Sequence, residues 1–407
     1  MDRLPLKRAA LLWDESFLWG VMAHRALASC GLACDIIRAA DVRSGRLRDY
    51  SALFVPGGWA SNKIKALGDG GVDAVMQFVR NGGSYVGFCG GAGLATEDGI
   101  GLLPVRRRPT KDRVPSFSGP IRLTVTDHAL WRGIADPVFH AWWPSQFTAD
   151  NSVAVLATYG EALPDAFSSD VNVGDARSLG AWSGLERTYG INLDPERLRN
   201  EPAVLEGTCG KGRVVLSLIH FDTPDDLNGA IVLGNLWNYL AAGEERTSII
   251  KTSGAPPSSV PALAAIQDAV AGLIDLGSRN FLWIRRNPLL LQWRRGVRGL
   301  EYCTLEVLTR EIAGLLRESP GISDPKSTEM LSSVRELLLP FVEKAKQLLV
   351  MERFALQNGH ITYERCDDPE ITALRIELFS RSKSHGGRFK EVIDALDNLL
   401  FCLLTGR

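Results

Sequence analysis

The sequence lacks an excess of charge of either sign. Its 407 residues hold 46 Lys and Arg against 47 Asp and Glu, which gives a formal net charge of −1. This balance excludes a chain-wide attraction to nucleic acid, and we expect no nucleic-acid partner. Long apolar runs are also missing: none approaches the roughly 18 residues that span a bilayer, so we expect no membrane span. The apolar run at the N-terminus ends at Asp14 and is too short for a signal peptide.

Cysteine is scarce and irregularly spaced. The seven cysteines are odd in number, and the closest pair is Cys30 and Cys34. Since no His lies near this pair, it is a poor metal site, and we expect neither a metal ion nor another cofactor. The spacing also argues against a disulfide framework, so we expect reduced thiols and a cytoplasmic location.

Two regions of different texture divide the chain. Across residues 1–243, short apolar runs alternate with segments of helical period, which predicts an α/β domain with a largely parallel, flavodoxin-like sheet and helices on both faces. Residues 244–260 are rich in charge, Ser, Gly and Pro and predict a linker. Residues 261–407 carry long helix-period segments and predict an all-α helical bundle domain.

The bundle offers packing surfaces rather than chemistry, and it is suited to a protein partner or to self-association. Its helices are expected over 261–276, 288–317, 326–357, 369–383 and 387–404. Pro340 lies inside the third helix and should kink or split it. Residues 284–298 gather arginines around an apolar run; we interpret them as a bundle helix with a basic face, and binding to an anionic surface is the alternative.

Chemistry-bearing residues of the first region follow the ends of expected strands. In a parallel sheet, ligands bind outside the carboxyl ends of the strands. The residues expected at that edge are Asp14, Glu15, Gly57, Gly58, Trp59, Cys89, His220 and Asp222. A thiol, an imidazole and carboxylates thus converge on one rim, which favours a functional site. Trp142 and Trp143 are interpreted as core residues, with lining of a ligand cleft as the alternative.

The segment GFCGGAGLA, residues 87–95, centres on Cys89. Glycines on both sides permit the strained backbone of a nucleophile elbow between a strand and a helix. The helix N-terminus and an adjacent base would both favour the thiolate. His220 is the expected base, and Asp222 would orient its ring. The alternative is a buried structural thiol at Cys89, with His220 bonded to a loop carbonyl and Asp222 capping a helix.

Backbone groups and neighbouring side chains complete the candidate site. The N–H groups of Gly58 and Gly90 are candidates for an oxyanion hole. The candidate substrate pocket consists of Gly57, Trp59, Asp14, Glu15 and Gly91. For the two acidic residues, a role at the start of a helix is the alternative. For Trp59, the alternative is packing beside the turn.

Four motifs together resemble a known superfamily. PGG (56–58), GFCGGAG (87–93) and GKGRVVLSLIHFD (210–222) look like the class I glutamine amidotransferases, whose pattern is G-x-C-x-G with a distant His-x-Glu. With VLATY (155–159), the closer resemblance is to the amidotransferase-like domain at the N-terminus of biotin-protein ligases. The likeness covers residues 6–243 and implies an amidotransferase-like fold.

The resemblance also implies residue roles. These are Cys89 as nucleophile, His220 as base, Asp222 as orienting acid, and Gly58 and Gly90 in the oxyanion hole. Two positions depart from the pattern: Gly93 stands where glutamine-hydrolysing members usually carry Gln, and Asp222 stands in place of Glu. The adenylate motif of a biotin ligase catalytic domain is missing, so we do not expect biotin ligation.

Two functions are compatible with these residues. The first is a cysteine-dependent amidohydrolase or amidotransferase-like hydrolase, which would attack a small-molecule carboxamide or related acyl group through a thioester. The second is a catalytically inactive amidotransferase-like module that binds a ligand or a protein beside a helical interaction domain. The intact thiol, imidazole and carboxylate favour the first; Gly93 favours the second.

Overall fold

The computed structural model describes residues 8–241, 261–318, 325–359, 361–362 and 366–406. It divides into two units, Met1–Ile249 and Ile250–Arg407, which are described separately. The expected linker, residues 244–260, lies outside the described residues.

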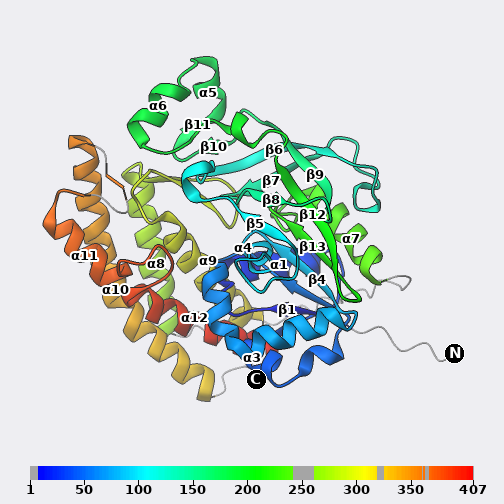
Figure 1. The fold of residues 1–407 in the computed structure, drawn as a ribbon. Coiled ribbons are helices and arrows are strands. Elements are labelled where there is room, and N and C mark those ends of the chain that lie inside the picture. Colours follow the sequence, from blue (N-terminus) through cyan, green and yellow to red (C-terminus); the bar gives the residue numbers. More distant parts are fainter. Residues whose placement is uncertain (1–7, 242–260, 319–324, 360, 363–365, 407) are drawn as a thin grey trace. The chain divides into compact units, whose positions relative to one another are not determined.

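An eleven-stranded sheet organises the first unit (Figure 1). Its strands are β1 (Ala9–Leu12), β2 (Cys34–Ile37), β3 (Ala52–Val55), β4 (Ser84–Phe88), β6 (Phe117–Val125), β7 (Val138–Trp142), β9 (Ala154–Ala162), β10 (Phe167–Ser168), β11 (Val171–Asn172), β12 (Pro202–Cys209) and β13 (Gly212–Ser217). The order is β11-β10-β6-β9-β12-β13-β4-β3-β1-β2, and β7 pairs with β6. Neighbours from β2 to β13 run parallel, and neighbours from β13 to β11 run antiparallel.

The parallel half of the sheet has the sequence expected of strands covered on both faces. β1, β3 and β4 read AALL, ALFV and SYVGF, and every residue in them is buried. Runs of this kind predict parallel strands between helical layers. The predicted α/β architecture is therefore confirmed, and the antiparallel half makes the sheet mixed.

Seven α-helices are described in the first unit. They are α1 (Phe17–Ser29), α2 (Ala39–Arg43), α3 (Ala60–Arg80), α4 (Gly90–Leu94), α5 (Val173–Ser178), α6 (Trp182–Tyr189) and α7 (Leu227–Ala241). Figure 1 places α5 and α6 beside β10 and β11, at the antiparallel end. A small second sheet pairs β5 (Val105–Arg107) with β8 (Phe147–Ala149). The non-helical backbone of Gly68 (φ 61°, ψ 176°) divides α3 into two helical parts.

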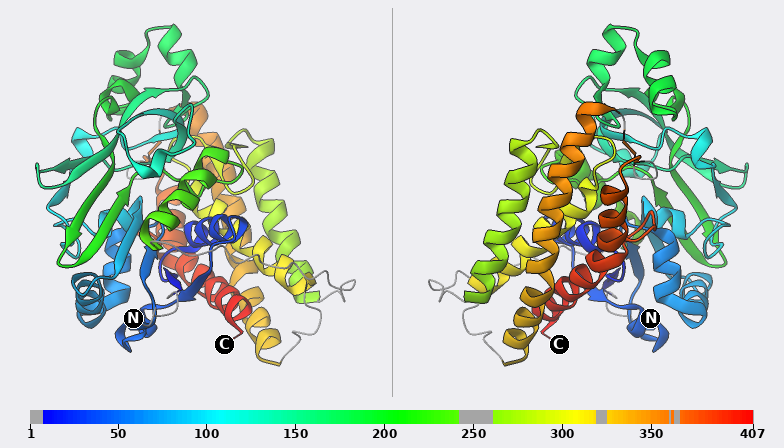
Figure 2. Two further views of the ribbon diagram at one scale, coloured as in Figure 1. Left: turned by 90° about the vertical axis from the view of Figure 1, so that its right-hand side faces the viewer. Right: turned by 90° about the vertical axis from the view of Figure 1, so that its left-hand side faces the viewer.

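The second unit is helical, as predicted. Its helices are α8 (Pro261–Arg279), α9 (Gly299–Glu318), α10 (Pro325–Asn358), α11 (Pro369–Phe379) and α12 (Gly387–Thr405). The long α10 packs against α8 and α12 (Figure 2). Phe341, Phe379 and Phe389 are fully buried where α10, α11 and α12 meet. Among the described helices of the chain, none is long and apolar enough to cross a membrane.

One prediction for this unit is wrong. The helix expected over 288–317 begins only at α9, and the arginine-rich segment before it forms a hairpin of β14 (Trp283–Arg285) and β15 (Leu291–Trp293). The side chain of Asn287 accepts hydrogen bonds from the N–H groups of two following residues, and this turn replaces the first helical turn. The helix α10 continues through Pro340 without a split, and the buried residues Leu338, Phe341 and Val342 flank the proline.

Replacing Gly91 with alanine should destabilise the first unit. A Cβ atom at this position would overlap the backbone carbonyl oxygen of Val55, and backbone cannot move aside as a side chain can. We expect Gly91→Ala to lower the free energy of unfolding by about 3 kcal/mol in urea denaturation. Gly70→Ala is the matched control: it meets no atom within 4 Å in an exposed part of α3, so stability should stay equal or rise. Equal stability of the two variants would contradict the prediction.

Candidate active site

Cys89 lies at the carboxyl end of β4, directly before the single turn of α4. Its backbone dihedrals, φ 47° and ψ −102°, lie in a region that side-chain-bearing residues rarely adopt. Its N–H donates to the carbonyl of Ser217 at 2.8 Å, and its own carbonyl accepts from Gly93 N–H at 2.9 Å. Hydrogen bonds to β13 and to α4 therefore hold a strained turn of the nucleophile-elbow kind.

The loop after β3 packs directly against this turn. A Cβ atom at Gly90 would overlap the carbonyl of Gly58, which itself has φ +112°. A Cβ atom at Gly57 would lie 3.2 Å from Cε1 of His220. The structure thus brings together the glycines that the sequence places beside Cys89, and they leave its surroundings lined by backbone.

His220 and Asp222 form a buried pair in the loop between β13 and α7. Nδ1 of His220 donates to Oδ1 of Asp222 at 2.9 Å, and the two residues are 0% and 1% exposed. The imidazole lies against the ring of Trp19, with centroids 4.8 Å apart. Within the described part of the chain, Nε2 of His220 has no hydrogen-bond partner. Asp222 therefore holds Nδ1 of the ring, and Nε2 is left for a proton transfer.

Charges around the imidazole favour its protonated form. Burial disfavours the charged ring, but Asp222 and Cys89 outweigh this effect and raise the pKa of His220 from 6.5 to about 10. The thiol of Cys89 is half-buried, and its sulfur lies 3.9 Å from the carbonyl oxygen of Trp142. The arrangement places an imidazole of raised pKa near a half-buried thiol.

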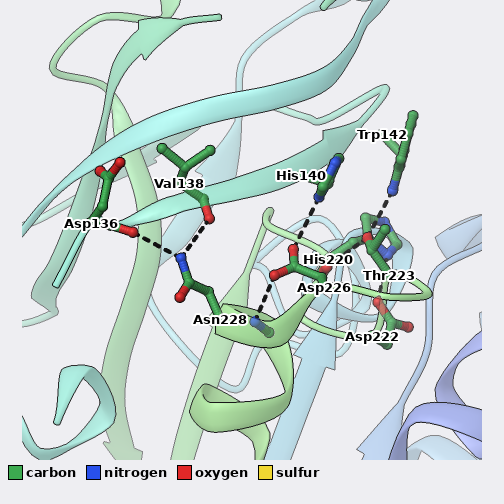
Figure 3. Close-up of polar contacts among 10 residues, drawn as sticks. Asp136, Val138, His140, Trp142, His220, Asp222, Thr223, Asp226 and Asn228 are labelled. Carbon is green, nitrogen blue, oxygen red and sulfur yellow. Dashed lines mark hydrogen bonds and ion pairs between the residues drawn. The ribbon is translucent and has the colours of Figure 1, made fainter. Parts of the chain in front are cut away.

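The antiparallel half of the sheet anchors the His220 loop (Figure 3). The backbone N–H of His220 donates to the carbonyl of His140 on β7 at 2.9 Å. The indole N–H of Trp142 donates to Thr223 at 3.0 Å, and His140 pairs with Asp226 at 3.0 Å. These contacts fix the loop on both sides of Asp222.

Two other predicted site residues have local partners, and a third is exposed. The carboxylate of Asp14 accepts from the N–H of Ala39 at 2.6 Å, at the start of α2. The carboxylate of Glu15 accepts from the side chain of Asn62 at 3.1 Å. Trp59 precedes α3 and is 38% exposed. The carboxylate of Asp14 is thus used to cap a helix rather than to join His220.

Trp142, interpreted as a core residue, is buried, whereas Trp143 is half-buried and its ring meets that of Trp19 edge to face, with centroids 6.2 Å apart. Two arginines of this region were not predicted. Cδ and Nη1 of Arg107 lie 3.4 and 3.5 Å from the position that a Cβ atom would take at Gly93. Burial lowers the pKa of Arg113, and Cys89 lies close enough to act against this effect. The missing side chain at Gly93 was visible in the sequence, but the residue that fills the space was not.

The described residues contain no group of three or more His, Cys, Asp or Glu side chains that could hold a metal ion. All seven cysteines are free thiols.

Comparisons with known proteins agree with this geometry. The family model "Biotin-protein ligase, N terminal" matches residues 46–98, which include β3, β4 and Cys89. The PurQ component of phosphoribosylformylglycinamidine synthase from Lacticaseibacillus paracasei is 27% identical over 231 residues, 53% of this chain and 94% of that protein. Its counterpart from Lacticaseibacillus casei is 27% identical over 214 residues, 49% of this chain and 89% of that protein.

Matches among solved structures are more distant. A protein assigned to GMP synthase from Thermoplasma acidophilum has 12% identity and a TM-score of 0.38, covering 58% of this chain and 95% of its own. A glutamine amidotransferase from Thermotoga maritima has 12% identity and a TM-score of 0.33, covering 57% of this chain and 82% of its own. From the family model and the PurQ relatives, the first unit is a class I glutamine amidotransferase-like domain. Its segment around Cys89 is similar to the N-terminal domain of biotin-protein ligases.

Glycine at position 89 should relieve backbone strain. The dihedrals of Cys89 are unfavourable for any residue with a Cβ atom, and glycine adopts them at low cost. We expect Cys89→Gly to have a free energy of unfolding about 1 to 3 kcal/mol higher than that of Cys89→Ala. Ala92→Gly in α4 is the control and should destabilise, since no strain is relieved there. A Cys89→Gly protein no more stable than Cys89→Ala would show that the turn is unstrained.

The His220 and Asp222 pair should make stability depend on pH. Because the folded-state pKa of His220 is raised, its contribution is fully present below the unfolded value of 6.5 and is lost as the pH rises through about 10. We expect Asp222→Asn to lower the free energy of unfolding by about 3 kcal/mol at pH 6, and by less at pH 10.5. The measurement is chemical denaturation at both pH values.

Asp226→Asn is the matched control for this experiment. Asp226 also pairs with a histidine, but the side chain of that His140 is 31% exposed, so the loss at pH 6 should be smaller than for Asp222→Asn. A penalty for Asp222→Asn that is the same at pH 6 and pH 10.5 would refute the assignment of charge to His220.

Proposed function

We propose that the first unit is a cysteine-dependent amidohydrolase or amidotransferase-like hydrolase that acts on a carboxamide or related acyl group through a thioester. The observation that carries this proposal is the half-buried thiol of Cys89, held in an elbow conformation beside an imidazole that Asp222 orients. A nucleophile, a base and an orienting acid within one site form the arrangement used for acyl transfer.

The reaction follows from these groups. The thiolate of Cys89 attacks the carboxamide carbon and forms a C–S bond, and the carbonyl oxygen becomes an oxyanion. The C–N bond then breaks, and the leaving nitrogen takes a proton from Nε2 of His220 and departs as ammonia. Water attacks the thioester and gives a proton to His220, and the C–S bond breaks to release a carboxylic acid and the thiolate. Asp222 holds the ring in position throughout.

Backbone N–H groups are the proposed oxyanion donors. Gly58 and Gly90 belong to the two turns that contact each other beside Cys89, and removal of one such donor costs about 3 kcal/mol of transition-state stabilisation in known cases. Gly57, Gly91, Glu15 and Trp59 are the proposed pocket walls. The carboxylate of Asp14 is occupied at α2.

A small-molecule amide is the proposed substrate, as for the glutamine amidotransferase relatives by their names. We also propose that the helical unit serves a protein partner or self-association, and that the free thiols reflect a cytoplasmic location. One observation favours the second function, an inactive binding module: Arg107 fills the space beside Gly93, within one turn of the nucleophile.

Thiol labelling tests the proposal. With limiting iodoacetamide at pH 6.5 and peptide mapping, Cys89 should react faster than the half-buried Cys30 and Cys209. His220→Ala should slow labelling of Cys89 by at least about tenfold, since the adjacent charged imidazole is lost. His128→Ala is the control, because His128 pairs with Glu206 on β12 rather than with the loop of His220, and it should leave the rate unchanged. Labelling of Cys89 no faster than of Cys30 would overturn the enzyme proposal and support the binding module.

A further inference from the structure

Four arginines lie between residues 106 and 113 of the first unit, and they fall into two classes. Arg106 forms an ion pair with Glu97, and Arg108 forms one with Glu201 at 2.7 Å. Arg107 and Arg113 form no ion pair with any described residue. Of the two arginines without a carboxylate partner, Arg107 lies against Gly93 and Arg113 lies near Cys89.

Arg107 lies in the space left by Gly93, close to the turn that carries the candidate nucleophile. The N–H of Gly93 donates to the carbonyl of Cys89 at 2.9 Å, so the two residues lie one turn apart. Cδ and Nη1 of Arg107 lie 3.4 and 3.5 Å from the Cβ position of Gly93. Pairing of β5 with β8, in which Arg107 opposes Phe147, fixes the backbone from which this side chain extends.

Arg113 is oriented by neutral hydroxyl groups. Nη1 donates to Ser145 and Nη2 donates to Thr110, each at 2.9 Å. Ser145 follows closely after Trp142, whose carbonyl contacts the sulfur of Cys89. Hydroxyl groups fix the direction of a guanidinium without neutralising its charge, so Arg113 keeps a full positive charge at the site.

This arrangement is unfavourable unless an anion joins it. The Nε atoms of Arg107 and Arg113 are buried and have no partner among the described residues. Burial and the like charge of Arg107 both lower the pKa of Arg113, while Cys89 acts in the opposite sense. The hydroxyl of Tyr159, a residue whose pKa is raised by burial and by Cys89, is also buried without a partner in the described chain. Unpaired buried donors cost free energy that a bound anion would restore.

We propose that Arg107 and Arg113 bind a carboxylate of the substrate beside Cys89, so that the substrate is an amide or acyl compound carrying this negative charge. The proposal rests on the proposed function and specifies its substrate class. Arg107 extends from β5 and Arg113 from the segment that follows it, and the carboxylate would satisfy their buried Nε–H groups.

Two alkylating reagents of nearly equal size test the proposal. Iodoacetate carries a carboxylate, whereas iodoacetamide is neutral, and each forms a bond to sulfur with loss of iodide. For Cys89, the iodoacetate-to-iodoacetamide rate ratio should exceed that for Cys209 in the same protein. Arg107→Gln and Arg113→Gln should each lower the ratio by roughly tenfold while leaving the iodoacetamide rate within about twofold, as loss of a charge-assisted hydrogen bond implies.

Arg106→Gln is the matched control. It removes a neighbouring arginine that already pairs with Glu97, so the ratio should not change. Arg113→Lys, which retains the charge, should preserve part of the ratio and separates loss of charge from misfolding. An unchanged rate ratio in both Gln variants would overturn the proposal. An equal fall of the iodoacetate and iodoacetamide rates would also overturn it, because the arginines would then act on the reactivity of the sulfur and not on the carboxylate.

A second measurement separates this proposal from the proposed function. Calorimetric titration of glutarate into Cys89→Ser protein detects the anion site without any reaction at sulfur. Binding that Arg107→Gln abolishes would support the carboxylate site even if Cys89 proved unreactive toward iodoacetamide. Absence of binding to the protein with both arginines intact would overturn it.

Discussion

The close approach of two backbone turns at the carboxyl edge of the parallel sheet is the constraint on which the site depends. The loop after β3 and the turn after β4 meet where Gly58 and Gly90 leave no room for a side chain. Hydrogen bonds from Cys89 to β13 and to α4 then hold the thiol in an unfavourable backbone conformation. Because three neighbouring parallel strands supply these contacts, the rest of the sheet fixes the position of one sulfur atom.

The antiparallel half of the sheet also holds the loop that carries His220. On its strand β7, the carbonyl of His140 accepts a hydrogen bond from the backbone N–H of His220. The indole N–H of Trp142, also on β7, donates to Thr223 in the loop that follows His220. The carbonyl of Trp142 also contacts the sulfur of Cys89. Parallel strands therefore position the nucleophile, and an antiparallel strand positions its partner. The two halves of the sheet meet at β13, directly between them.

The sequence predicted the parts of the site that obey general rules. Cys89, His220 and the glycines follow buried apolar strands, and parallel strands deliver their carboxyl ends to one edge. It could not predict Arg107, because pairing of β5 with β8 depends on contacts between segments distant in the chain. The hairpin before α9 was missed for a different reason: its apolar run also fits helical spacing, and only the turn at Asn287 decides between the two.

The excess of positive charge around Cys89 is evidence on whether the site has a function. A merely structural thiol would pack best among apolar groups, since burial of charge without compensation costs free energy. Around Cys89 the chain instead places a protonated imidazole and two arginines, with one buried carboxylate, that of Asp222, hydrogen-bonded to the imidazole. A bound anion would compensate this excess of positive charge. Gly93 then acquires a positive role, because its missing side chain leaves the space that Arg107 occupies.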